Sequence, residues 1–376
     1  MKITEVIVHV LEAALSEPFH WSINRADVRA SAVVEVVTES GLSGFGECLG
    51  PARPCAAMVE AYAPLLLGND ALASELIWQT LYDRFRDQGQ KGVPIAALSG
   101  VDIALWDLKG KHFGAPVHQL MGGPLRTEVE AYATGTYRKD QGDPFDYIID
   151  EVKGYVTEGF GGVKLKIGFE VSEDAALIRA VRQAIGPDVK LMLDANHGYD
   201  VIEAIRLGRQ VEDCDITWFE EPVVPEDLAG YSEIKRAIAI PLAGGECEYT
   251  RFGFRQVLAS RAIDILQPDT CAAGGLSECK KIADMAWAHG VRYVPHVWGT
   301  AIGLATALQL LAVLPHNPPG NRPLEPVLEF DRSEHPARQA VVREPIEHVG
   351  GRVQVPEGPG LGIEIDRAGL ESFKVN

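Results

Sequence analysis

A repeating alternation in the second part of the chain restricts the fold more than any other feature of the sequence. Short apolar runs alternate with amphipathic stretches, some with Asp or Ser near their start and Gly at their end, as helices prefer. The apolar runs are residues 129–135, 162–168, 189–196, 216–222, 241–246, 263–269, 292–297 and 325–330. Eight repeated βα units predict a parallel sheet closed into a (β/α)8-type barrel.

An open, doubly wound α/β sheet is the alternative that this alternation allows. Dinucleotide-binding sheets of that kind carry a Gly-x-Gly-x-x-Gly turn after the first strand. The chain has no such turn in that position, so the closed barrel is favoured.

The first 124 residues follow a different order, with strands first and helices afterwards. Strands are predicted over residues 3–10 and 31–38, with a third after a turn at residues 39–41. The predicted helices are residues 57–67, 74–86 and 94–113, and the predicted loops are residues 16–29 and 48–55. This order is typical of a compact α+β domain.

Three segments follow from these patterns. We expect an N-terminal α+β capping domain over residues 1–124 and a (β/α)-barrel catalytic domain over residues 125–330. Residues 331–376 are rich in loops and have no place in a barrel of eight units. We expect this C-terminal segment to return to the capping domain and complete it.

Composition excludes some classes of function. The 376 residues are 46% apolar and 23% charged, which is ordinary for a globular protein. A net charge of −18 without a basic patch disfavours nucleic acid as a partner. The chain shows no membrane-spanning stretch and no signal peptide, and its six scattered cysteines lack framework spacing. We therefore expect a cytoplasmic protein with free thiols and no membrane partner.

Two lysines stand out within the predicted strand at residues 162–168. Lys164 and Lys166 are two positions apart, so their side chains leave the same face of the strand. A strand covered on both faces rarely carries charge, because an unpaired buried cation costs several kcal/mol. Either the strand is exposed and the lysines are solvated, or anionic groups face them.

Polar residues at the ends of the other predicted strands favour the second explanation. They are Asp194, Glu220, Glu246, Asp269, His296 and Glu329, each about one βα unit from the next, and Lys166 precedes them. In a closed barrel, such residues meet at the mouth formed by the carboxyl ends of the strands, where barrel active sites lie.

Asp194, Glu220 and Glu246 come from three consecutive strands. Three converging carboxylates repel one another unless a cation lies among them, and oxygen ligands suit Mg²⁺ or Mn²⁺ better than Zn²⁺. Each acid also has a purely structural explanation, as a turn residue or a charge at a helix start. Together they predict a metal site.

Asp269 and His296 end adjacent strands. A carboxylate beside an imidazole fixes its tautomer and raises its basicity, which makes His296 a candidate general base. We expect Lys166 to approach from the opposite side, with a pKa lowered by the cation and by Lys164. Two bases about a metal-bound substrate form a site that can remove a proton next to a carboxylate.

Several motifs resemble the mandelate racemase subgroup of the enolase superfamily. They are KLKIG (164–168), LMLDANHGY (191–199), WFEEPVVPED (218–227), AGGE (243–246), ILQPD (265–269) and VPHVWGTAIG (294–303). The resemblance extends into the first domain through GECLGP (46–51) and residues 97–111. It implies a homo-oligomer and an enzyme that uses Mg²⁺.

The resemblance also implies a role for each site residue. Asp194, Glu220 and Glu246 become the Mg²⁺ ligands. The acid/base pair becomes Lys166, with Lys164 as its electrostatic partner, and His296, oriented by Asp269. Glu329, or failing that Glu325, matches the position that hydrogen-bonds a substrate carboxylate.

Within the subgroup, stretches such as GECLGPARP and DANHGY look most like galactarolactone cycloisomerases. These enzymes open an acid-sugar 1,4-lactone by β-elimination to give a 3-deoxy-2-keto-hexarate. On this basis we favour His296 as the abstracting base, and Arg53, Asn196 and Trp298 as substrate-binding residues under the two loops of the cap. The alternatives are an aldarate or aldonate dehydratase, a racemase, and a non-catalytic barrel that binds sugar acids.

Overall fold

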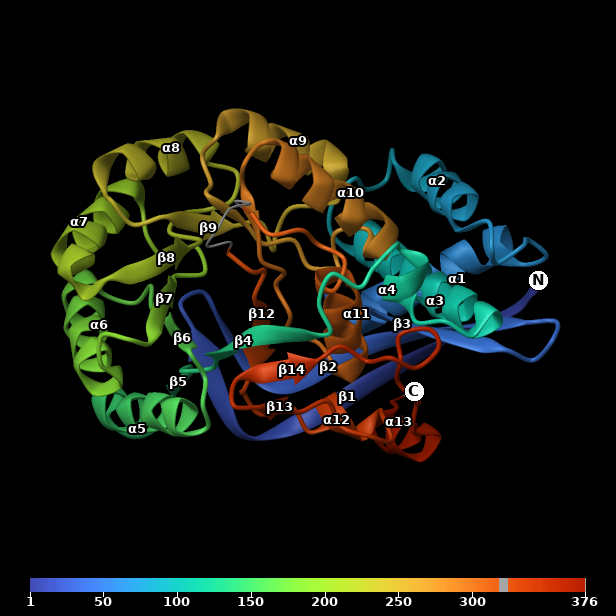
Figure 1. Cartoon of the computed structure of the whole chain (residues 1–376), viewed down its shortest axis with the longest axis horizontal. Coiled ribbons are helices and arrows are strands. Elements are labelled where there is room, and N and C mark those ends of the chain that lie inside the picture. The colour runs from blue at the N-terminus through green and yellow to red at the C-terminus, as the bar shows by residue number, and fades with distance from the viewer. Residues whose placement is uncertain (318–323, 376) are drawn as a thin grey trace.

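Eight parallel strands form the barrel that the alternation predicts. The computed structural model of the chain describes residues 1–317 and 324–375 (Figure 1). The strands pair in the order β12, β4, β6, β7, β8, β9, β10, β11. They are β4 (Glu128–Thr134), β6 (Gly162–Lys166), β7 (Lys190–Asp194), β8 (Ile216–Glu220), β9 (Leu242–Gly244), β10 (Ile265–Leu266), β11 (Arg292–Tyr293) and β12 (Leu328–Asp331).

Helices join successive strands and cover the outside of the barrel, as Figure 1 shows. They are α5 (Pro144–Thr157), α6 (Val171–Ile185), α7 (Val201–Val211), α8 (Leu228–Ala237), α9 (Thr250–Ser260), α10 (Gly275–Ala288) and α11 (Ala301–Leu311), with the 3-10 turn η1 (Glu212–Cys214) after α7. Most of these helices begin with a side-chain cap, and Asp200 and Glu203 form a capping box at α7.

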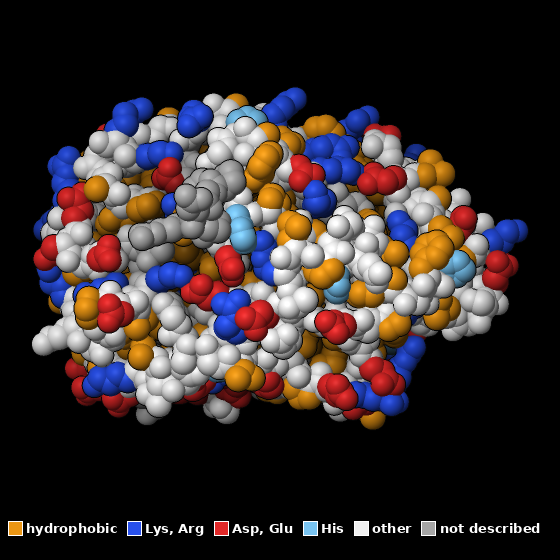
Figure 2. Space-filling model, in the orientation of Figure 1, with side chains coloured by type: hydrophobic (Ala, Val, Ile, Leu, Met, Phe, Trp, Pro, Cys, Tyr) orange, Lys and Arg blue, Asp and Glu red, His pale blue; other side chains and the backbone are white. Residues whose placement is uncertain are grey.

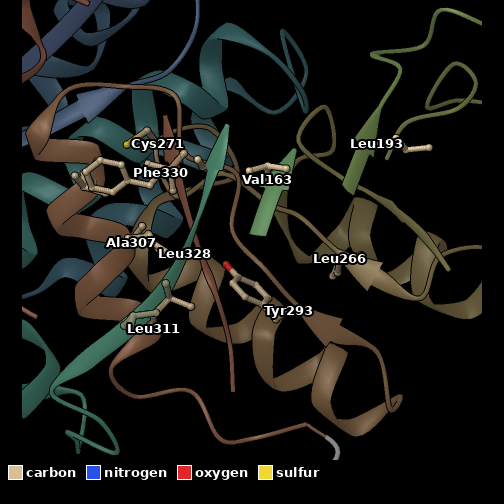
Figure 3. Close-up of a cluster of buried hydrophobic side chains, with 14 of the residues drawn as sticks. Val163, Leu193, Leu266, Cys271, Tyr293, Ala307, Leu311, Leu328 and Phe330 are labelled. Atoms are coloured by element: carbon tan, nitrogen blue, oxygen red, sulfur yellow. The ribbon is translucent and has the colours of Figure 1, made fainter. Parts of the chain in front are cut away.

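Residues alternate along each strand between the interior and the helical layer. On β6, Val163 and Leu165 belong to the large core beneath the helices. Figure 3 shows part of that core, with Leu328 and Phe330 of β12 beside Ala307 and Leu311 of α11. A smaller cluster fills the barrel with side chains from successive strands, namely Tyr132, Met192, Trp218, Ala243, Ile265 and Val294. The polar residues of the mouth lie beyond this apolar layer.

The cap is a sheet packed on helices. The sheet order is β3 (Ser43–Cys48), β2 (Asn24–Thr38), β1 (Ile3–Trp21) and β5 (Arg138–Lys139), all antiparallel. The helices are α1 (Ala52–Leu66), α2 (Ser74–Phe85), α3 (Val93–Phe113) and the short α4 (Val117–Leu120). Helix α3 approaches β3 closely at Gly46, where a Cβ atom would lie 2.0 Å from the carbonyl oxygen of Gly100.

The prediction of a loop over residues 16–29 is wrong. These residues continue β1 and β2 as one long hairpin, in which Phe19 pairs with Ala26 and Trp21 pairs with Asn24. Polar residues and Pro18 conceal the strand pattern, and the register shifts between Ala14 and Phe19. Strand β5 pairs with Phe19 and His20, so the hairpin reaches the barrel (Figure 1).

The C-terminal segment divides between the two sheets. Its hairpin, β13 (His348–Val349) and β14 (Arg352–Gln354), follows α12 (Ala337–Ala340) and pairs with β4 of the barrel, not with the cap as expected. Helix α13 (Arg367–Phe373) then packs against the cap strand β1, and the Val375 N–H donates to the Val10 carbonyl at 2.9 Å.

The surface carries both acidic and basic side chains. In Figure 2, Lys and Arg side chains are interspersed with Asp and Glu over the visible face. Within residues 1–317 and 324–375, every helix is too short or too polar to cross a bilayer.

The lowered pKa of Glu35 predicts how the contact between α13 and the cap sheet depends on pH. Its buried carboxylate accepts hydrogen bonds from Arg367 of α13 at 2.5 and 2.7 Å, and its Oε2 lies 3.0 Å from His9 Nε2. Burial raises the pKa of Glu35, but its bonds to His9 and Arg367 outweigh burial and lower it to about 2. A lowered carboxyl pKa stabilises the fold above pH 4.5 and loses that contribution as the pH falls toward 2.

Glu35→Gln should therefore reduce the free energy of unfolding by about 1–2 kcal/mol at pH 7, allowing for the partial exposure of Arg367. The difference in the free energy of unfolding between Glu35→Gln and the parent protein should become smaller when urea unfolding is repeated at pH 3. Glu371→Gln, which removes an exposed pair with Lys374, is the control and should have little effect at either pH. A difference for Glu35→Gln that is equal at both pH values would contradict this account.

Candidate active site

The mouth of the barrel gathers the polar residues predicted at the strand ends. Lys166, Asp194 and Glu220 are the last residues of β6, β7 and β8, and Glu329 lies in β12. Glu246, Asp269 and His296 lie just after the next three strands. Asp269 and His296 also form an isolated parallel bridge, which continues the sheet beyond β10 and β11.

The two lysines of β6 are buried and face carboxylates. Of the two explanations offered for them, this confirms the one in which anionic groups face the lysines. Lys164 is 1% exposed, and its Nζ lies 2.6 Å from both Glu220 Oε1 and Glu329 Oε1. Lys166 Nζ lies 2.5 Å from Asp194 Oδ2 and 2.8 Å from Asn196 Oδ1. Burial of this many charges is tolerable only because each faces an opposite charge at hydrogen-bonding distance.

Asp194, Glu220 and Glu246 converge as the sequence predicts. One oxygen from each lies within 4.8 Å of the others, a separation that a single cation can bridge. All three donors are carboxylate oxygens, which fits a hard divalent cation. The second oxygen of Glu220 is fixed by the indole N–H of Trp218 at 3.0 Å and the amide of Gln267 at 2.7 Å. The acidic cluster can therefore hold a metal ion.

His296 lies on the other side of this cluster from β6. Its Nδ1 is 2.7 Å from Asp269 Oδ2, and its Nε2 is 3.6 Å from Glu246 Oε2. Asp269 is in turn fixed by the backbone N–H of Cys271 at 2.6 Å. The Asp269 contact therefore directs Nε2 of His296 toward the carboxylates.

The carboxylates decide the protonation of the two candidate bases. Burial lowers the pKa of Lys166, but the Asp194 carboxylate more than compensates and raises it. His296 behaves similarly, because burial lowers its pKa while Glu246 and the bond to Asp269 raise it to about 10. These directions reflect the charges of the protein alone, so the lowering of the Lys166 pKa by a bound cation stays a prediction.

A cavity of about 280 Å³ opens between the mouth and the cap. Lys166, Glu246, His296 and Glu329 line it from the barrel, and Trp21 of the β1–β2 hairpin lines it from the cap. Glu329 already bonds Lys164 and accepts from the backbone N–H of Val297 at 3.0 Å. The cavity size fits a small molecule held against the carboxylate cluster.

The structure brings together only some of the predicted substrate-binding residues. Asn196 and Trp298 line the cavity, and the buried indole N–H of Trp298 has no hydrogen-bond partner among the described residues. Arg53 does not line it: this exposed side chain bonds Glu12 at 3.2 Å. Glu325, the alternative to Glu329, is also exposed and lies 3.7 Å from Arg352.

Arg29 is the cationic residue of the cavity wall that the sequence analysis missed. It is 3% exposed, lies over the Trp298 ring at 3.8 Å, and donates to the Trp298 carbonyl at 2.6 Å. Tyr137 and Tyr249 also line the cavity without having been predicted. Arg29 could have been predicted at this position only if residues 16–29 had been recognised as strands, and the sequence pattern predicts a loop there.

Comparisons with known proteins agree with this architecture. Residues 2–122 match the model of the mandelate racemase / muconate lactonizing enzyme N-terminal domain, and residues 147–369 match that of the enolase C-terminal domain-like family. The D-galactarolactone cycloisomerase of Agrobacterium fabrum is 52% identical over 375 residues, covering 100% of this chain and 99% of that protein. The arabinonate dehydratase of Saccharolobus solfataricus is 36% identical, covering 90% of this chain and 89% of that one.

Among solved structures, the 3,6-anhydro-D-galactonate cycloisomerase of Zobellia galactanivorans aligns with a TM-score of 0.91. It is 39% identical and each chain is covered completely. The family resemblance of the sequence motifs, the two matching domain models and this structural agreement lead to one conclusion. The chain is an enzyme of the mandelate racemase / muconate lactonizing enzyme family, in the enolase superfamily.

Proposed function

We propose that this enzyme opens an acid-sugar 1,4-lactone, with galactaro-1,4-lactone as the first candidate, to give a 3-deoxy-2-keto-hexarate. The observation that carries the proposal is the approach of Lys166 and the His296–Asp269 pair to one carboxylate cluster from two sides. The full-length similarity to a D-galactarolactone cycloisomerase supports the choice of substrate.

We assign Asp194, Glu220 and Glu246 as ligands of Mg²⁺, with Mn²⁺ as a substitute. Bound there, the ion would supply a Lewis acid that stabilises negative charge on a substrate carboxylate. Glu220 is held in place by Trp218 and Gln267, and Asp194 accepts the N–H of Asn196 at 3.0 Å. These bonds fix the donor oxygens before any ligand binds, which limits the cost of ordering them.

The protein side chains then move the protons. His296, oriented by Asp269, removes the proton from the carbon beside the free carboxylate. The bond between the neighbouring carbon and the ring oxygen breaks, and the ring oxygen leaves as part of a carboxylate. The resulting enol takes a proton on that neighbouring carbon, which we assign to Lys166, and loses its hydroxyl proton to give the ketone.

The remaining cavity residues position the substrate and exclude water. Lys164 balances the charge of Glu220 and Glu329 behind the reacting atoms. Trp298 offers a buried N–H that has no partner within the described ranges, and Asn196 lines the same cavity. We replace Arg53 by Arg29 as the source of positive charge for a second carboxylate, because Arg29 lines the cavity and Arg53 does not. Arg29 pairs with Asp331, but Arg338 shares that carboxylate, so the two arginines carry one positive charge more than Asp331 balances.

A dehydratase is the second candidate. The arabinonate dehydratase noted above and an L-rhamnonate dehydratase of Saccharopolyspora erythraea, 34% identical, favour it. The same proton would leave, but a hydroxyl group would depart as water in place of the ring oxygen. A racemase would use Lys166 and His296 as two bases.

Three broader expectations belong to this proposal. We place the enzyme in the cytoplasm and expect a homo-oligomer that acts on a small acid sugar, without nucleic acid or membrane. We retain residues 1–124, 125–330 and 331–376 as the capping, catalytic and C-terminal segments. The pairing of β14 with β4 ties the third segment to the second as well as to the first.

Metal binding can be tested without substrate. Mg²⁺ should raise the melting temperature of the metal-free protein, because a ligand that binds only the folded state stabilises it. In Glu246→Gln that increase should largely disappear, since one of three carboxylate ligands is lost. Glu248→Gln, two residues further and paired with Lys91, is the matched control and should keep it. An equal Mg²⁺-dependent increase in both variants would remove Glu246 from the ligand set.

Substrate and reaction type can be separated by one screen. Aldarates, aldonates and aldaro-lactones are incubated with enzyme and Mg²⁺ in D₂O and followed by ¹H NMR. We expect lactone consumption with one deuterium gained beside the new ketone. Water loss from an open acid would establish the dehydratase instead, and exchange without net conversion would establish the racemase.

The base assignment predicts a difference between variants. His296→Asn should lower kcat by about 10²–10⁴-fold, the usual contribution of a general base. His289→Asn, which changes an exposed histidine after α10, should leave kcat unchanged. Retention of substrate-proton exchange in His296→Asn, with its loss in Lys166→Met, would transfer the role of abstracting base to Lys166.

A further inference from the structure

A second group of ligand-type side chains lies beside the carboxylate cluster. It consists of His197, Glu221 and Cys247, which come from the loops and strand ends that also carry Asp194, Glu220 and Glu246. One potential ligand atom from each lies within 4.8 Å of the other two. His197 Nε2 is 3.2 Å from Glu221 Oε2 and 3.6 Å from Cys247 Sγ.

The backbone holds this group together. The N–H of His197 donates to the carbonyl of Glu221 at 2.9 Å, and the N–H of Glu221 donates to the carbonyl of Ala243 at 3.1 Å. His197 and Glu221 adopt positive φ angles of 65° and 44°, which cost free energy for residues with a Cβ atom. The loops after β7 and β8 are therefore fixed relative to each other, which holds His197 and Glu221 in place beside Cys247.

Glu221 lacks the partners that a buried carboxylate needs. It is 1% exposed, and neither of its oxygens receives a hydrogen bond from residues 1–317 or 324–375. The nearby cations are committed elsewhere: Lys164 pairs with Glu220 and Glu329, and Lys166 pairs with Asp194. His197 is the one basic group within ion-pair distance of Glu221 in the described part of the chain. A buried carboxylate without donors costs several kcal/mol unless it takes up a proton or a cation compensates it.

The donor atoms indicate which cation would fit. An imidazole nitrogen, a thiolate sulfur and a carboxylate oxygen form a mixed set that borderline cations such as Zn²⁺ and Co²⁺ prefer, whereas Mg²⁺ prefers oxygen alone. The neighbouring cluster of three carboxylates has the opposite preference. Two adjacent sites with different donor chemistry can therefore select different cations.

We propose that His197, Glu221 and Cys247 form a second cation site, selective for a borderline divalent cation such as Zn²⁺. Three protein ligands leave one position open on a tetrahedral ion. Cys247 also lines the substrate cavity next to Glu246, so an ion bound there contacts the wall of the active site. The proposal concerns binding alone and does not depend on which acid sugar is the substrate.

Co²⁺ provides the direct test, because a thiolate bound to Co²⁺ produces an intense near-ultraviolet charge-transfer absorption that oxygen ligands do not. The full-length protein is saturated with Mg²⁺ and titrated with Co²⁺. We expect a thiolate band that saturates at one Co²⁺ per chain and is removed by adding Zn²⁺. Zn²⁺ affinity is measured in parallel by competition with a chromophoric chelator.

Matched variants identify the ligands. Cys247→Ser should abolish the band, and Cys214→Ser, which alters a buried thiol after α7, should retain it. His197→Gln and Glu221→Gln should weaken Zn²⁺ binding at least about tenfold while leaving the thermal stabilisation by Mg²⁺ in place. If Cys247→Ser does not fold, His197→Gln decides the question, because it preserves the thiol.

Two results would overturn the proposal. The first is Co²⁺ binding that competes with Mg²⁺ and shows no thiolate band, which would mean that only the carboxylate cluster takes the ion. The second is Zn²⁺ affinity that is unchanged in His197→Gln and Glu221→Gln. Either result would leave Glu221 paired with His197 as a closed ion pair.

Discussion

The burial of Lys164 and Lys166 in β6 is the constraint on which the barrel mouth depends. The strand has no exposed residue, yet it carries two cations on one face. Their neighbours in β7, β8 and β12 supply Asp194, Glu220 and Glu329, and each contact is 2.5–2.6 Å long. Removing one partner from such a network leaves a buried charge uncompensated, at a cost of about 3–5 kcal/mol. The same contacts therefore fix the strand ends and set the charge of the site.

The cap is joined to this mouth by buried polar bonds, and Glu47 of β3 makes several of them. Its carboxylate accepts from Ser31 Oγ at 2.7 Å, and from the backbone N–H groups of Thr300 and Gly303 at the start of α11. A carboxylate at this end of a helix also interacts favourably with the helix dipole. Helix α11 begins just after His296 and Trp298, so the position of the cap and that of the candidate base are mechanically coupled.

The sequence was sufficient to predict the positions of the site residues that lie at the ends of the barrel strands. The ends of parallel strands in a barrel meet at one face, so spacing alone was enough to place Asp194, Glu220 and Glu246 together. Arg29 and Arg53 show the limit of that reasoning. Both lie in the cap, where no repeat fixes the register: Arg29 is placed by the extent of the β1–β2 hairpin, whereas Arg53 lies at the start of α1 and bonds Glu12. His197, Glu221 and Cys247 follow nearly the same spacing, one to three residues beyond Asp194, Glu220 and Glu246, but the strand pattern does not show which side chains after the strand ends turn toward one another.

The pKa shifts of Lys166 and His296 depend on the charge of the carboxylate cluster. The carboxylates that could hold a cation are also the groups that raise the pKa values of Lys166 and His296. A divalent cation among these carboxylates would offset their negative charge, and their hold on both protons would weaken. If a metal ion binds Asp194, the attraction between this carboxylate and the Lys166 ammonium group becomes weaker. Cation binding and the release of the two bases from their ion pairs are therefore linked, because both depend on the negative charge of the same carboxylates.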